Sequence, residues 1–333
     1  SASELIEYLV ELKIDGVAVA IIYEEEKLVR GITRGDGRQG DDITRNIRTI
    51  GTVPKKLRED LSGTLEVRGE IYFERPAFEK MNENREKQGL SPFANPRNAA
   101  AGTLKLLDAR LVAQRPLTVF LHGMGYTNLR RLPRTHGELL QWFRDLGLRT
   151  NPQNQVAEGV EGIHRLIDEW EEKRHDLDYE TDGLVVKVNR RDWQADLGAT
   201  SKSPRWVVAY KFSAEQAETV LESVGWNVGR TGHLRPVLLA GTTVKRATLH
   251  TTHFRRKKDL HLGDHVLIEK GGEIIPKVIE VVMGKRQEGL QKVAIPERCP
   301  SCGSALQAEE GADSETGEQV PDMHLVCIDA ACP

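Results

Sequence analysis

A lysine placed between two carboxylates is the first feature of this sequence that suggests covalent chemistry. The segment ELKIDG, residues 11–16, sets Lys13 two residues from Glu11 and two residues from Asp15. A lysine amine at its ordinary pKa of about 10.4 is protonated at neutral pH and cannot attack an electrophile. Nearby cations or burial lower a lysine pKa, whereas carboxylates raise it. The segment alone therefore leaves two interpretations open, a nucleophile and a structural ion pair.

Two further lysines occur in similar segments. Lys187 lies in DGLVVKVN and Lys211 lies in AYKF. The β-branched and aromatic residues around these lysines favour buried strands. We expect the amines to share a cleft with Lys13, where clustered cations help to free its lone pair and bind phosphate, with Asp15 or Glu70 balancing part of the charge.

All four cysteines lie near the end of the sequence, in two close pairs on either side of a polar loop. The pairs are Cys299 with Cys302 and Cys327 with Cys332. This arrangement matches a tetrahedral zinc site with four thiolates. Two disulfides are the alternative, but the N-terminus shows no basic region followed by an apolar signal core, and disulfides are rare inside cells. The pattern therefore favours zinc.

Composition excludes some functional classes. The sequence has 333 residues, a formal net charge of -3 and 29% charged residues, so it is not a histone-like polycation. A local basic groove is still compatible with these values, because nucleic-acid affinity depends on where Lys and Arg cluster. The run RRKK at 255–258 is either a solvated loop or a phosphate contact. No apolar run reaches membrane-spanning length, so we expect a soluble cytoplasmic protein with no membrane partner.

Residues 1–214 are predicted to form an α+β domain with antiparallel sheets. VAVAIIY and LVRGIT, joined by an acidic turn, predict a hairpin. Helices are expected at three segments with proline, glycine or capping signals: PAFEKMNENREKQG, PRNAAAGTLKLLD and THGELLQWFRDLG. Further strands are expected at TVFLHGMG, DGLVVKVN and WVVAYKF.

Two smaller domains are expected after residue 214. Short strands punctuated by glycine and proline over residues 215–295 predict a small β-barrel such as an OB-fold. The strand segments are TTVKRATLH, DHVLIEK and IIPKVIEVV. Residues 296–333 contain the cysteine pairs and are expected to form the zinc module.

The order of several motifs is more specific than any one of them. After KIDG come TRGDGRQGDDIT, EVRGE, NPRNAAAGTLK, DGLVVKVN, SPRWVVAYKF and VGRTG. With this set the sequence resembles the NAD-dependent DNA ligases of the bacterial type over nearly all of its length. The resemblance implies a nucleotidyltransferase (adenylation) domain with ATP-grasp-like antiparallel sheets and helices, an OB-fold domain and a four-cysteine zinc finger.

The resemblance also implies catalytic roles. Lys13 matches the lysine that attacks the α-phosphate of NAD and becomes adenylylated, and Asp15 matches its acidic partner. Lys187 belongs to the fourth nucleotidyltransferase motif, and Lys211 belongs to the fifth, where the family lysine contacts the AMP phosphate. The implied reaction is the sealing of nicks in double-stranded DNA.

Further residues are implied to bind the nucleotide or the DNA. Glu11 matches the residue that reads the adenine amino group, while Arg34 and Glu70 match residues around the phosphate and ribose. Asp182 lies in the fourth motif, and His122 lies where the family usually has a tyrosine under the adenine. The residues implied to face nicked DNA are Arg97, Lys105 and Arg230, of which Arg230 has capping of a barrel turn as its alternative. The implied cofactors are NAD, Mg²⁺ and Zn²⁺, and we expect a monomer.

The sequence departs from the family pattern in four places. His122 replaces the usual tyrosine and offers less stacking area, and Lys105 stands where arginine is common and lacks its bidentate fork. The segment after VGRTG is several residues shorter than the family pattern. The family's N-terminal nicotinamide-mononucleotide domain and its helix-hairpin-helix and BRCT regions have no counterpart in these 333 residues. We interpret the sequence as part of a longer protein that by itself reacts poorly with NAD but seals a preadenylylated nick.

Two other classes of function remain as alternatives. One is an ATP- or GTP-dependent nucleotidyltransferase, such as an RNA ligase or a capping enzyme, which shares the lysine motif and the following barrel. The cysteine pairs and VGRTG argue against it. The other is a noncatalytic DNA-binding protein built on a decayed transferase domain. The presence of Lys13, Glu70, Lys187 and Lys211 disfavours decay.

Overall fold

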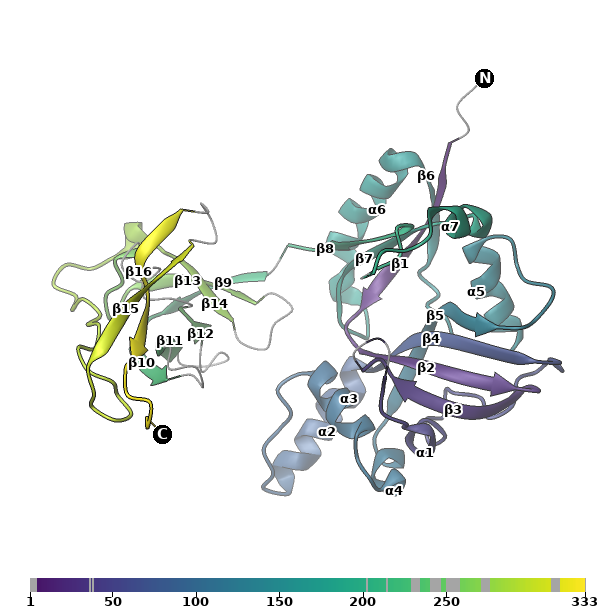
Figure 1. Ribbon diagram of the computed structural model, residues 1–333, viewed down its shortest axis with the longest axis horizontal. Coiled ribbons are helices and arrows are strands. Elements are labelled where there is room, and N and C mark those ends of the chain that lie inside the picture. Colours follow the sequence, from purple (N-terminus) through teal and green to yellow (C-terminus); the bar gives the residue numbers. More distant parts are fainter. Residues whose placement is uncertain are drawn as a thin grey trace. The chain divides into compact units, whose positions relative to one another are not determined.

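The computed structural model describes most of the chain. The described residues are 5–35, 37, 39–201, 203–213, 215–228, 234–239, 247–249, 258–270, 276–312 and 318–332. The chain divides into two compact units, Ser1–Phe212 and Ser213–Pro333 (Figure 1). Arg230, residues 255–257 of the RRKK run and much of the segment TTVKRATLH lie outside the described residues.

The first unit contains a four-stranded antiparallel sheet that includes the predicted hairpin. β2 (Val17–Glu24) and β3 (Lys27–Thr33) pair directly, which confirms the hairpin. The two turn residues, 25–26, both have positive φ, as a two-residue type I′ turn requires. β4 (Thr64–Phe73) pairs with β2, and β5 (Leu117–Thr127) pairs with β4, so the strand order is β3-β2-β4-β5.

A second antiparallel sheet of the same unit has the order β6-β1-β7-β8. Its strands are β6 (Gln155–Glu158), β1 (Glu7–Ile14), β7 (Thr181–Val188) and β8 (Val207–Lys211). Helix α6 (Gly159–Lys173) lies along this sheet in Figure 1. The apolar face of the sheet and α6 share a buried core, which includes Val10, Leu12, Leu166, Ile167, Trp170, Leu184 and Val186. The opposite face carries Glu11, Lys13, Lys187 and Lys211 together with apolar residues such as Leu9 and Val185, since side chains alternate along a strand.

The helices described in the first unit are α1 (Thr44–Ile47), α2 (Arg75–Lys87), α3 (Pro96–Leu104), α4 (Ala109–Ala113), α5 (His136–Asp145), α6 and α7 (Arg191–Leu197). Of these, α3, α4 and α5 begin at a residue whose side chain caps the helix. The capping box predicted for α5 is present, because Thr135 and Glu138 each bond the other's backbone N–H. Among the described residues, no helix has the length and apolar character needed to cross a membrane.

One predicted helix is shorter than expected. The segment PRNAAAGTLKLLD was expected to be a single helix, but α3 ends at Leu104 and α4 begins separately at Ala109. The carboxylate of Asp108 accepts the backbone N–H of Arg110, so Asp108 is the N-cap of the next helix, α4, and is not part of α3. Several elements of the first unit, among them β4, β6, α1, α6 and α7, were not among the predictions.

The second unit contains a six-stranded sheet of order β10-β11-β12-β14-β13-β9 and a separate hairpin. The sheet strands are β9 (Glu215–Val220), β10 (Ser223–Val228), β11 (Leu234–Leu239), β12 (Ala247–Thr248), β13 (His265–Lys270) and β14 (Lys277–Val281). The strands predicted at DHVLIEK and IIPKVIEVV are thus confirmed. The hairpin of β15 (Leu306–Ala312) and β16 (Gln319–Cys327) carries one of the four cysteines at its end.

Candidate active site

Lys13 and Lys211 stand on the same face of the β6-β1-β7-β8 sheet. Gly183 of β7 pairs with Lys13 on one side and with Lys211 on the other. Residues that lie directly opposite each other in a ladder point their side chains to the same face. A Cβ on Gly183 would lie 2.0 Å from the carbonyl oxygen of Tyr210, so only glycine fits between the two lysines. Lys211 is exposed to solvent.

Lys13, near the end of β1, forms an ion pair with the carboxylate of Asp182 on β7. Its Nζ lies 2.9 Å from Oδ1 of Asp182 and donates a hydrogen bond to Oδ2 at 3.1 Å. Asp15, two residues further on, accepts a hydrogen bond of 2.8 Å from Arg97 of α3. A β-bulge between Lys13 and Ile14 separates these two carboxylate contacts. An ammonium group has no lone pair, so Lys13 must give up a proton before it can act as a nucleophile.

Glu11 and Lys187 form a buried ion pair on the same face. Both side chains are about 5% exposed, and Nζ of Lys187 lies 2.5 Å from Oε2 of Glu11. Nζ also donates to the carbonyl oxygen of His122 at 2.6 Å. Lys187 lies four residues beyond Gly183 on β7, and Gly183 is the residue opposite Lys13. This separation corresponds to a rise of about 13 Å along the strand, so Lys187 and Lys13 are not neighbours in the sheet. The charge of Lys187 is therefore matched by Glu11 and held apart from Lys13.

His136 completes this buried cluster and was not selected from the sequence. Its Nε2–H donates to the carbonyl oxygen of His122 at 2.9 Å, and its Nδ1 accepts from Gln194 at 3.4 Å. Burial, reinforced by Lys187, lowers the pKa of His136 well below its ordinary value and lowers that of His122 to about 3. Both imidazoles are therefore neutral at pH 7. Nothing in the spacing of the sequence marks His136, because its partners come from different strands and helices.

A cavity of about 760 Å³ opens within the first unit over these residues. This volume lies in the range of pockets that bind cofactors and other small molecules. The predicted site residues that line it are Glu11, Lys13, Arg34, Glu70, Arg97, Lys105, His122 and Lys187. Lining residues that were not predicted include Arg68, His136, Asn151, Asn154, Arg191 and Gln194. The cavity thus gathers cations and carboxylates from both sheets and from α3.

The other predicted site residues of the first unit that the structure describes, Asp15, Asp182 and Lys211, are not among the residues that line the cavity. Asp15 and Asp182 contact Arg97 and Lys13 respectively, as described above, and Lys211 lies across Gly183 from Lys13. Arg230 is outside the described residues. Trp206 also lines the cavity. The spacing of Arg68 could have identified it from the sequence. Arg68 lies two residues before Glu70 on β4, so both side chains are on the same face of the strand.

Glu70 has an unusual protonation equilibrium in this cavity. Burial raises its pKa from the ordinary 4.5 to about 7, although the positive charges of Lys13, Arg97 and Arg34 oppose the shift. A carboxyl group that is half protonated near neutral pH can donate a hydrogen bond in one form and accept in the other. The group therefore changes its hydrogen-bonding character within the physiological pH range.

Replacing Glu70 by glutamine should stabilise the chain by an amount that grows as pH rises. The native state keeps the Glu70 proton up to about pH 7, whereas the unfolded chain loses it near pH 4.5. Between about pH 4.5 and pH 7 the free energy of unfolding therefore falls because of Glu70. Above about pH 7 the whole of this loss of stability is present. We expect the free energy of unfolding of Glu70→Gln to exceed that of the unaltered chain by about 1–3 kcal/mol at pH 8. At pH 4.5 the two free energies of unfolding should be nearly equal.

Urea unfolding at several pH values between 4.5 and 8 measures this difference. Glu24→Gln, at an exposed position on β2, is the matched control and should show no such trend. A stability difference between Glu70→Gln and the unaltered chain that does not change with pH would contradict the prediction.

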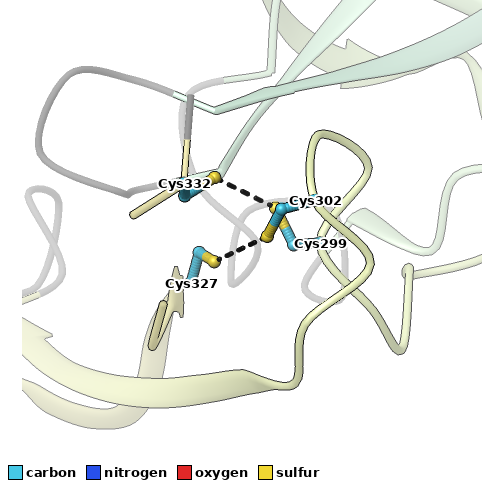
Figure 2. Close-up of side chains that lie close together, drawn as sticks. All are labelled: Cys299, Cys302, Cys327 and Cys332. Atoms are coloured by element: carbon cyan, nitrogen blue, oxygen red, sulfur yellow. Dashed lines mark hydrogen bonds between the residues drawn. The ribbon is translucent and has the colours of Figure 1, made fainter. Parts of the chain in front are cut away.

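The four cysteines form a compact cluster in the second unit (Figure 2). The Sγ atoms of Cys299 and Cys332 lie 3.7 Å apart, those of Cys302 and Cys327 lie 3.5 Å apart, and all four lie within 4.8 Å of one another. Tetrahedral zinc with Zn–S bonds of about 2.3 Å separates its sulfurs by about 3.8 Å. A disulfide needs about 2.05 Å, and all four thiols are free. The cluster is compatible with a zinc module.

The fold and the lysine-lined cavity define a class of protein: a nucleotidyltransferase domain followed by an OB-fold domain and a four-cysteine module. Residues 1–215 match the NAD-dependent DNA ligase adenylation domain, and residues 218–290 match the NAD-dependent DNA ligase OB-fold domain. This chain belongs to the NAD-dependent DNA ligase family. The resemblance and the α+β fold class with an OB-fold predicted from the sequence are confirmed.

Similar proteins support this assignment along the whole chain. The DNA ligase of Desulforudis audaxviator (strain MP104C) is 46% identical over 339 residues, which cover 100% of this chain and 49% of that protein. The DNA ligase of Bacillus cereus (strain AH820) is 43% identical over 334 residues, 98% of this chain and 48% of its own length. This chain therefore spans about half the length of these relatives. Among solved structures, the match to "Pmar-Lig_Pre." covers 83% of this chain and 62% of that chain, with a TM-score of 0.47 and 14% sequence identity. The family assignment therefore rests on the sequence matches.

Proposed function

We propose that this chain carries the AMP-transfer and strand-sealing steps of a DNA ligase that uses NAD and acts on nicks in double-stranded DNA. The observation that carries the proposal is the position of Lys13. Its amine lies on the wall of a cavity of about 760 Å³ that also presents Arg34 and Arg97. A lysine nucleophile surrounded by fixed cations suits the transfer of a negatively charged phosphoryl group.

In the first step the Lys13 amine attacks the α-phosphorus of NAD. Asp182 Oδ2, which accepts a hydrogen bond from Nζ at 3.1 Å, is positioned to take the proton. A P–N bond forms between Lys13 and AMP, the P–O bond to nicotinamide mononucleotide breaks, and the mononucleotide leaves with the bonding electron pair. The lysine thus holds AMP covalently and divides one difficult condensation into separate transfers.

The buried ion pair supports recognition of adenine. Glu11 offers a carboxylate oxygen to the exocyclic amine, and the Nζ of Lys187 offers a donor to the adjacent ring nitrogen, N1. Guanine presents a carbonyl oxygen and an N–H at these two positions, so both contacts would be repulsive. His122 lines the same cavity and supplies the ring that we place against the base.

In the second step AMP passes from Lys13 to the 5′-phosphate of the nick, and in the third the 3′-hydroxyl attacks that phosphate and displaces AMP. Each transition state spreads negative charge over equatorial oxygens, and we propose that Arg34, Arg97 and Lys211 stabilise this charge. Lys105 and Arg230 are proposed to contact the DNA.

Two metal ions belong to the proposal. Mg²⁺ would neutralise phosphate charge, and carboxylates suit it as ligands. Asp182 is one candidate ligand, because its Oδ1 is buried and makes no hydrogen bond of good geometry within the described part of the chain, although it forms an ion pair with Nζ of Lys13 at 2.9 Å. Glu70 is the other candidate. Zn²⁺ would hold the four-cysteine cluster together. We also propose that the protein acts as a monomer in the cytoplasm.

A preadenylylated nicked duplex tests the proposal, because this substrate enters after the NAD step. The chain should join the strands, seen on a denaturing gel, and should acquire the mass of one AMP residue by the reverse of AMP transfer. Incubation with ATP or GTP should give no adduct. Binding to the nick without joining would contradict the proposal and favour a noncatalytic DNA-binding protein.

The family match disfavours the alternative of an ATP- or GTP-dependent nucleotidyltransferase. The adenylation and OB-fold matches are both to the NAD-dependent ligases, and together they cover most of the chain. An AMP or GMP adduct formed from ATP or GTP alone would revive this alternative.

A further inference from the structure

Two buried oxygen atoms in the cavity lack hydrogen-bond partners within the described part of the chain. They are Oε1 of Glu11 and Oδ1 of Asn154. Both residues line the same cavity. Buried polar atoms in folded proteins nearly always have a partner, so unpaired acceptors inside a cavity point to a ligand that supplies donors.

The strand register places these two residues side by side. The ladder between β1 and β6 ends with the pair Val10 and Gln155. Continuing the antiparallel register by one residue sets Glu11 opposite Asn154. Opposite residues point to the same face, with Cβ atoms about 4.5–5.5 Å apart. Two acceptors at this spacing can flank one small donor group.

The other neighbours of Glu11 leave its Oε1 available. Oε2 is engaged by Lys187 at 2.5 Å, while the nearest nitrogen of His136 lies 3.6 Å from Oε1, beyond hydrogen-bond distance. Lys187 and His136 are both committed to the carbonyl oxygen of His122. A primary amine, which has two N–H groups, can satisfy Glu11 and Asn154 at the same time.

We propose that Asn154 determines specificity for a primary amine on the base, because its Oδ1 accepts the second N–H of the adenine exocyclic amine while Glu11 accepts the first. This inference rests on the proposed function, since it assigns a residue to the same nucleotide site. A 6-keto base such as hypoxanthine turns a carbonyl oxygen toward two acceptors. An N6-methylated adenine keeps one N–H for Glu11 but directs its methyl group at Asn154.

Calorimetric titration of the 333-residue chain with AMP, N6-methyl-AMP and IMP tests the proposal. The unaltered chain should bind AMP at least about 10-fold more tightly than N6-methyl-AMP, because one hydrogen bond is lost and a methyl group meets a polar atom. Asn154→Ala should bind AMP about 5–10-fold more weakly, and its preference over N6-methyl-AMP should fall to about 2-fold or less, since the methyl group fits the vacated space. Weak binding of IMP should persist, because Glu11 and Lys187 remain.

Asn151→Ala is the matched control from the same loop. Asn151 also lines the cavity, but its amide is engaged by the hydroxyl of Tyr179 at 3.0 Å and the backbone N–H of Gln153 at 2.9 Å, so its loss should leave the AMP preference unchanged. A folded Asn154→Ala that keeps the full preference for AMP over N6-methyl-AMP overturns this inference alone. An unaltered chain that binds none of the three nucleotides overturns the proposed function and the inference with it.

Discussion

Replacing Lys13 by arginine should lower formation of the covalent AMP adduct by more than about 10³-fold, because the chain loses its proposed nucleophile. Arginine keeps the positive charge beside Asp182, so the cavity should stay assembled. Joining of a preadenylylated nick needs no amine attack and should remain measurable. Intact-mass analysis with a preadenylylated nick measures the adduct, and a denaturing gel measures the joined strand.

Lys27→Arg is the matched control for this experiment. Lys27 is an exposed residue of β3 and is not among the cavity residues, so the same chemical change there should leave both the adduct and strand joining intact. An AMP adduct that persists in Lys13→Arg would show that another residue is the nucleophile. Complete loss of strand joining together with loss of folding would be detected by circular dichroism and excluded from the comparison.

Replacing Cys302 by serine should remove zinc from the chain and release the segment that carries the cysteines. A structural zinc site supplies about 10–16 kcal/mol of apparent binding free energy at pH 7, far more than the short β15–β16 hairpin supplies on its own. Native mass spectrometry should find one zinc ion per unaltered chain and none in Cys302→Ser. Limited proteolysis should then cleave within residues 296–332, while residues 5–212 stay resistant.

Ser301→Ala provides the control for the zinc experiment. Ser301 is exposed and adjacent to Cys302, so this change alters the same turn without removing a thiolate. It should retain one zinc ion and full protease resistance. An unaltered chain purified without chelator that contains no zinc, or a Cys302→Ser chain that keeps its zinc, would contradict the prediction.

The sequence predicts those parts of the fold that depend on local patterns. The β2–β3 hairpin follows from two β-branched runs around a short turn, and α5 follows from its capping box. The end of α3 was predicted too late, at Asp108 instead of Leu104, because the apolar residues Leu106 and Leu107 continue the pattern beyond the helix. Local signals thus set the type of an element more reliably than its end.

The candidate site divides in the same way. Lys13, Glu70 and Lys187 were identified through ordered motifs and the family resemblance, and the structure brings them to one cavity. His136 and Asn154 were not identified, because their positions at the cavity depend on which elements become neighbours in the fold. Asn154 gains its position only through the pairing of β6 with β1, and no spacing along the chain encodes that pairing.

The alternation of β1 has a consequence for insertions and deletions in the gene. The side chains of Val10 and Leu12 pack in the core on one face of the sheet, while Glu11 and Lys13 line the cavity on the other face. A single added codon between residues 9 and 13 would exchange the two faces of the strand, so that a lysine side chain would be buried among aliphatic groups and a leucine side chain would face the cavity. Two added codons would preserve the parity of the strand, so mutational tolerance here should depend on whether the number of inserted codons is even or odd.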